Sequence, residues 1–92
     1  MDDTIDARFQ AFHQQNPHVF ALLVALAREA QQRGARRIGA KALMERARWD
    51  LALETSGDEY RLNNTFASRY ARLIADTHDD LAGLFEFRRL AA

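Results

Sequence analysis

Four polar residues at helical spacing form the surface of this sequence that is best suited to chemistry. They occupy positions i, i+3, i+4 and i+7, which a helix places on one face. Arginine can make a bidentate contact with guanine, and hydroxyl side chains hydrogen-bond to phosphates or base edges. The pattern therefore predicts a helix over about residues 65–75 that reads double-stranded DNA. The four residues are Thr65, Ser68, Arg69 and Arg72.

A basic segment adds candidate phosphate contacts to this reading helix. The chain is neutral overall, with 13 basic and 13 acidic side chains, so only a local basic face can attract an anionic partner. Residues 28–48 carry such a face, with Glu29 and Glu45 as the only acids. Asn64 stands at the entry of the reading helix, where amide groups favour phosphate. The predicted phosphate contacts in the basic segment are Arg33, Arg36, Arg37 and Lys41.

Two observations oppose a plain DNA-binding motif. A helix-turn-helix joins its helices by about three to four residues, whereas about eleven separate the third and fourth predicted helices here. The polar face of residues 65–75 is also compatible with a solvated helix surface whose arginines meet acids such as Asp76. If the motif is present, it is a divergent one with a long ordered loop at 54–64, and the sequence leaves open whether that loop forms a β-wing.

The alternative function is a protein-interaction module without nucleic-acid affinity. Trp49 is the lone tryptophan and falls off the main apolar stripe of its helix. Tryptophan is enriched at interface hot spots, so Trp49 and Tyr60 are the candidate contacts for a partner protein. The competing interpretation packs Trp49 partly buried against Tyr60. Small domains with leftover aromatic residues also complete their cores by dimerising, so a homodimer is a further alternative.

Catalysis and metal binding lack the residues they need. Cysteine is absent, which excludes a disulfide framework and a thiolate zinc site. The three histidines, His13, His18 and His78, lack the i, i+4 spacing of a helical metal site. No nucleophile, base and orienting group form a catalytic set. The glycines stand singly, so the sequence has no glycine-rich phosphate-binding loop. We expect no enzyme activity, no catalytic residue, no metal and no cofactor.

Length and composition predict one small domain over residues 1–92. The chain is 48% apolar and 28% charged, which is typical of a globular protein. Its longest apolar stretch, residues 19–27, is about half of the roughly 20 residues that a bilayer span requires. Asp2 and Asp3 stand where a secretory signal carries basic residues. We therefore expect no membrane association and a cytoplasmic location.

Helix formers and helix breakers predict an all-α fold. The chain has 17 alanines, four glycines and one proline. Asn16 and Pro17 predict a helix start, and Gly34 predicts its end. That helix, residues 17–33, is apolar on nearly all sides and should form the centre of a compact bundle. The expected five helices cover about residues 4–15, 17–33, 40–53 and 65–75, and a last one begins at Asp79 or Asp80.

Six segments resemble a group of small proteins encoded by bacteriophages and prophages. The resemblance covers about residues 9–89 and departs at Thr77-His78-Asp79, where similar sequences often carry a proline. It implies a phage or prophage origin and a compact helical fold, and it implies no mechanism. Small phage proteins are commonly regulators that bind DNA or accessory factors that bind a host or phage protein, so the resemblance implies a partner of one of these kinds. The segments are Phe12-His13, Asn16-Pro17-His18-Val19, Lys41-Ala42-Leu43, Leu62-Asn63-Asn64, Ser68-Arg69-Tyr70-Ala71-Arg72-Leu73-Ile74 and Asp80-Leu81-Ala82-Gly83-Leu84-Phe85-Glu86-Phe87-Arg88.

Overall fold

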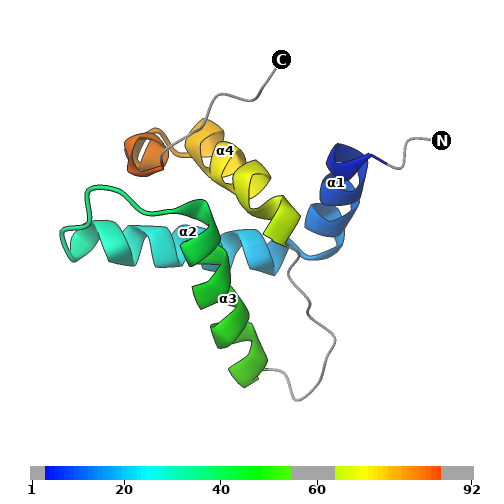
Figure 1. The fold of residues 1–92 in the computed structure, drawn as a ribbon, viewed down its shortest axis with the longest axis horizontal. Coiled ribbons are helices and arrows are strands. Elements are labelled where there is room, and N and C mark those ends of the chain that lie inside the picture. The colour runs from blue at the N-terminus through cyan, green and yellow to red at the C-terminus, as the bar shows by residue number, and fades with distance from the viewer. Residues whose placement is uncertain (1–3, 55–63, 86–92) are drawn as a thin grey trace.

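The computed structural model confirms an all-α fold over the residues it describes, 4–54 and 64–85. The described residues form helices α1 to α4 and two short 3-10 helices, one directly before α4 and one after it (Figure 1). Tyr60 and residues 55–63 of the predicted ordered loop lie outside the described residues. The elements are α1 (Ile5–Gln15), α2 (Pro17–Gln32), α3 (Ala40–Glu54), η1 (Asn64–Phe66), α4 (Ala67–Thr77) and η2 (Asp79–Leu84).

The junction between α1 and α2 shows how local residues set helix boundaries. The Thr4 hydroxyl caps α1 by accepting a hydrogen bond from the Ala7 amide at 3.1 Å. Pro17 opens α2, as predicted, because its fixed φ angle suits the first helical turn. Asn16 precedes it, but the Asn16 side chain does not cap α2. Its amide nitrogen instead donates to the Phe12 carbonyl at 3.0 Å, which closes the end of α1.

Gly34 ends α2, also as predicted. Its φ of +95° is the only positive φ among the described residues. The Ala35 amide donates to the Ala30 carbonyl and the Gly34 amide to the Gln31 carbonyl, both at 3.0 Å. These two bonds form a Schellman motif, which satisfies carbonyls at the end of the helix. The motif turns the chain sharply, so that residues 33–39 lead back towards the body of the protein (Figure 1).

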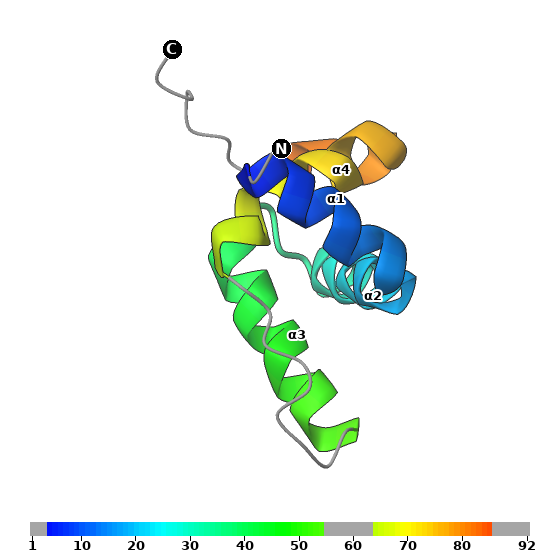
Figure 2. The same cartoon turned by 90° about the vertical axis from the view of Figure 1, so that its right-hand side faces the viewer.

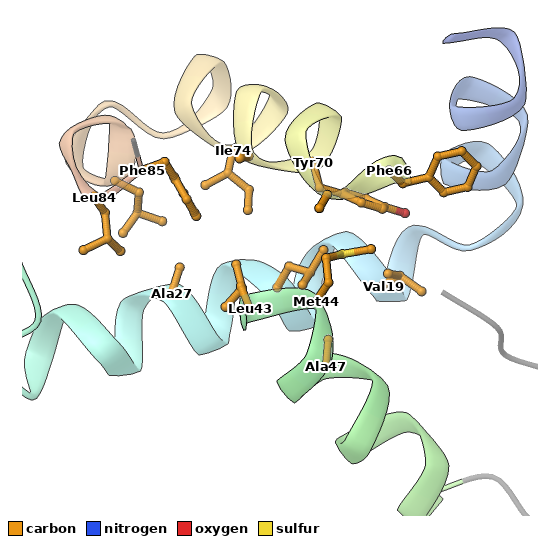
Figure 3. Close-up of a cluster of buried hydrophobic side chains, with 14 of the residues drawn as sticks. Val19, Ala27, Leu43, Met44, Ala47, Phe66, Tyr70, Ile74, Leu84 and Phe85 are labelled. Carbon is orange, nitrogen blue, oxygen red and sulfur yellow. The ribbon is translucent and has the colours of Figure 1, made fainter. Parts of the chain in front are cut away.

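Helix α2 lies at the centre of the fold, in agreement with its nearly all-round apolar sequence. Its residues Val19, Leu23 and Ala27 are fully buried. It contacts α1, α3, α4 and η2. Side chains from α4 and η2 meet those of α2 and α3 in one continuous core (Figure 3). Helix α3 joins this core through its first half and extends away from the other helices in its second half (Figure 2).

The fourth and fifth predicted helices differ from expectation at their ends. Residues 64–66 form a 3-10 turn, and α4 begins only at Ala67 after Phe66, with no side-chain cap. The predicted final helix is also a short 3-10 helix, Asp79–Leu84, within the described residues. It is followed by an isolated parallel bridge between Ile38 and Phe85. The bridge fastens the connection between α2 and α3 to the end of η2.

Candidate functional site

An apolar cleft lies between the second half of α2 and the first half of α3. We call it the α2–α3 cleft, and its volume is about 250 Å³. Its walls are mostly aliphatic, with charged side chains among them. The lining residues are Leu26, Glu29, Ala30, Arg33, Ile38, Ala42, Leu43 and Arg46.

Small side chains on the two facing helices contribute to the cleft. Ala30 of α2 and Ala42 of α3 both line it, and alanine fills much less space than the leucines beside it. Ile38 also lines the cleft, and it is held by its backbone, because its amide donates to the Leu84 carbonyl at 2.9 Å. The cleft wall thus combines two helices with a connection that is fastened to η2, which makes it a preformed feature of the fold.

The charged side chains of the cleft are paired along their own helices. Arg33 lies 3.1 Å from the Glu29 carboxylate, and Arg46 lies 3.4 Å from the carboxylate of Asp50. Both are i, i+4 pairs at the surface, and such pairs contribute only about 0.3–0.5 kcal/mol. A charged partner can therefore replace them at low cost.

Trp49 is strongly exposed beyond the cleft, on the projecting half of α3. Its exposed fraction is 64%, so the interpretation that it packs partly buried is wrong. It follows Ala42 by seven residues and Arg46 by three. Because an α-helix repeats every 3.6 residues, these three residues share one side of α3. The exposed tryptophan and the cleft wall are therefore parts of one surface.

The predicted phosphate contacts of the basic segment collect around α3 and the cleft. Arg33 caps the end of α2 and lines the cleft. Arg36 and Arg37 are exposed on the connection that follows, and Lys41 is exposed in the first turn of α3. The structure thus keeps these four residues on the chain that leads from α2 into α3.

The predicted reading face on α4 lies towards the opposite end of α2. Helix α2 has 16 residues, which corresponds to about 24 Å. Near the start of α2, α1 contacts η1 and α4. The Arg69 guanidinium of α4 donates to the Asp6 carboxylate of α1 at 2.6 Å, and the rings of Phe9 and Phe66 lie 5.7 Å apart. Arg69 is thus already engaged within the molecule.

The other predicted residues of that face occupy different environments. Thr65 and Ser68 are exposed, and Arg72 is half-buried. Thr65 and Asn64 belong to η1, so the predicted continuous helix with Thr65 in its first turn is wrong. The reading face is consequently shorter than predicted, and one of its two arginines already pairs with a carboxylate.

A polar cluster fastens η2 to α2 on another part of the molecule. Arg28 pairs with Asp80 and lies 3.1 Å from Nδ1 of His78. Gln31 also donates to the Asp80 carbonyl at 2.8 Å. The hydrogen bond from Arg28 lowers the pKa of Asp80. These contacts link residues about 50 positions apart, so the cluster has a clear structural role.

Among the residues that the structure describes, two buried polar atoms lack a hydrogen-bond partner, Nδ1 of His13 and the hydroxyl of Tyr70. Their rings meet edge to face at 6.2 Å within a group of aromatic side chains. Burial raises the pKa of Tyr70 to about 12, so the phenol is neutral at physiological pH. No group of three or more possible metal ligands occurs in the described part of the chain.

No helix among residues 4–54 and 64–85 combines the length and apolar character required to span a membrane. Comparison with models of protein families, with curated proteins and with solved structures gave no match. The resemblance to small phage proteins stays a prediction.

Sequence reasoning identified Trp49 and Arg33 as candidate contacts but missed the α2–α3 cleft. Leu26 and Ala30 lie beside the buried residues of α2, so the apolar pattern alone assigns them to the core. Nothing in the sequence distinguishes Ala42 from the other helix-forming alanines. The sequence carries one signal of the cleft, because apolar residues surround α2 on nearly all sides. In the structure, the described neighbours of α2 leave part of that apolar surface only partly covered.

Proposed function

We propose that this protein is a protein-interaction module that binds its partner through the α2–α3 cleft and Trp49. The observation that carries the proposal is the combination of a preformed apolar cleft with an exposed tryptophan on the same side of α3. Interfaces concentrate their binding energy in a few residues, and these are typically aromatic or arginine side chains at desolvated pockets.

The size of the cleft favours a protein partner over a small molecule. Ligand pockets usually measure about 300–1,000 Å³ and enclose most of their ligand. The α2–α3 cleft is smaller, at about 250 Å³, and it is open to solvent. It suits one or two apolar side chains that a partner inserts while the rest of the partner covers Trp49.

A first experiment places a photo-reactive side chain at position 42, in the cleft wall, and at position 21 as a control. Ala21 is also an exposed helix alanine, but it does not line the cleft. We expect crosslinking to a cellular protein from position 42 only. Trp49→Ala should then weaken the affinity for that captured protein by about 2 kcal/mol or more. Equal crosslinking from both positions contradicts the proposal.

DNA binding is the second candidate function, and the exposure of Arg36, Arg37 and Lys41 on one short stretch favours it. Phosphate contacts release counterions, so the affinity for duplex DNA should fall steeply between about 50 and 200 mM salt. Changing Arg69 and Arg72 to alanine then costs about 1–3 kcal/mol each if the two side chains read bases. Absence of DNA binding at 50 mM salt removes this candidate.

A further inference from the structure

We infer that the partner segment recognised by the α2–α3 cleft is an acidic amphipathic peptide, with apolar side chains on one face and carboxylates beside them. This inference rests on the proposed function and specifies the chemistry of the partner. The inference is based on the aliphatic floor of the cleft and on the excess of basic side chains around it.

The floor requires apolar anchors on the partner. Leu26, Ile38 and Leu43 line the cleft. Binding becomes favourable at their hydrocarbon surface when apolar groups of the partner remove it from water. Phosphates and sugars offer no such groups. Trp49 lies one turn beyond Arg46 on α3, so a partner helix with apolar residues at i, i+3, i+4 and i+7 can fill the cleft and cover the indole together.

The charges around the floor require carboxylates on the partner. Residues 29–50 contain six basic and three acidic side chains. Arg33 and Arg46 line the cleft itself, together with Glu29, and Arg36 and Arg37 follow on the exposed connection. Complementary charge increases the association rate and disfavours partners of the wrong sign. A basic or neutral amphipathic segment lacks this advantage.

A second copy of this chain fits the cleft less well. The same basic surface would then face itself in a symmetric dimer, because such an interface brings one patch against its own copy. The mass of the protein in solution checks this alternative directly.

The test uses two synthetic helical peptides of 14 residues without tryptophan or tyrosine. Both carry leucine at i, i+3, i+4 and i+7, and the remaining positions are glutamate-rich in one and lysine-rich in the other. Trp49 is the lone tryptophan, so its emission reports on burial at this surface. We expect the acidic peptide to bind at least about tenfold more tightly, with a blue shift and an affinity that decreases with salt.

Two test variants, each with a matched control, assign the binding to the cleft. Ala42→Glu should abolish binding of the acidic peptide, whereas Ala21→Glu should leave it unchanged. The double variant R33Q/R46Q should weaken binding at least about fivefold. Its matched control, R69Q/R72Q, removes the same charge from α4 and should change the affinity less than about twofold.

Each contrary result has a distinct meaning. Equal binding of both peptides that Ala42→Glu abolishes overturns the acidic preference and leaves the proposed function intact. Acidic-peptide binding that survives Ala42→Glu overturns the assignment to the cleft. Lack of binding of the acidic peptide at millimolar concentration overturns the inference, while crosslinking from position 42 still decides the proposed function separately. A monomer–dimer equilibrium that Ala42→Glu abolishes identifies a second copy as the occupant.

Discussion

Substitution of Gly34 by alanine tests the turn that forms one edge of the cleft. Gly34 has a φ of +95°, and a Cβ built there meets no atom within 4 Å. The cost of Gly34→Ala is therefore conformational and not steric. Left-handed backbone costs an L-residue about 1–2 kcal/mol, and we expect that loss in the free energy of unfolding.

Urea denaturation measures this loss, and Gly83→Ala provides the matched control. Gly83 has no positive φ and also has open space around a built Cβ. Alanine there should leave stability unchanged or raise it by about 0.4–1 kcal/mol through the unfolded chain. For a domain of this size, each kcal/mol corresponds to about 4–8 °C in Tm. Equal effects of the two substitutions refute the argument from the positive φ.

Three further predictions concern the core and its polar contacts. Leu23 is fully buried, so Leu23→Ala should cost about 2–5 kcal/mol in urea denaturation, and a loss below 1 kcal/mol contradicts the described core. Tyr70→Phe should raise stability by about 1 kcal/mol, because it removes a buried hydroxyl without a partner; a destabilised variant implies a hydrogen bond to that hydroxyl. The pKa of Asp80 is lowered by Arg28, so this ion pair contributes stability above the unfolded pKa of about 4 and loses it as pH falls through the folded value. Asp80→Asn should remove that acid-dependent part of the unfolding free energy, and an unchanged pH profile contradicts it.

Helix boundaries were predictable where a residue type has one dominant conformation. Pro17 and Gly34 placed the ends of α2 to within one residue, because proline fixes φ and glycine tolerates the left-handed turn. Asn16 could not be assigned in the same way. Its side chain can bond to either neighbouring helix, and it bonds to the Phe12 carbonyl of the preceding one.

Contacts between distant segments were not predictable from spacing. Arg69 pairs with Asp6, 63 residues away, so the predicted reading face contains an ion pair that no local pattern reveals. The α2–α3 cleft also depends on which faces of two helices meet. A pattern of apolar residues predicts that a face is covered, but it does not predict which neighbour covers it or where alanines leave space.

The exposure of Trp49 illustrates the same limit. Its position off the apolar stripe was visible in the sequence, but the projection of the second half of α3 from the bundle was not (Figure 2). An amphipathic stripe predicts packing over a whole helix, whereas the side chains that the core buries within residues 40–50 of α3 are Leu43, Met44 and Ala47. The tryptophan follows that contact and remains 64% exposed.

The most direct test of partner binding at the α2–α3 cleft is a titration of the isotope-labelled protein with the acidic peptide, followed by amide chemical shifts. We expect the shifts to concentrate at Ala30, Ile38, Ala42 and Arg46 and at the Trp49 indole. Shifts that concentrate on α4, at Ser68 and its neighbours, or an absence of shifts at millimolar peptide would contradict the assignment of this cleft as the binding surface.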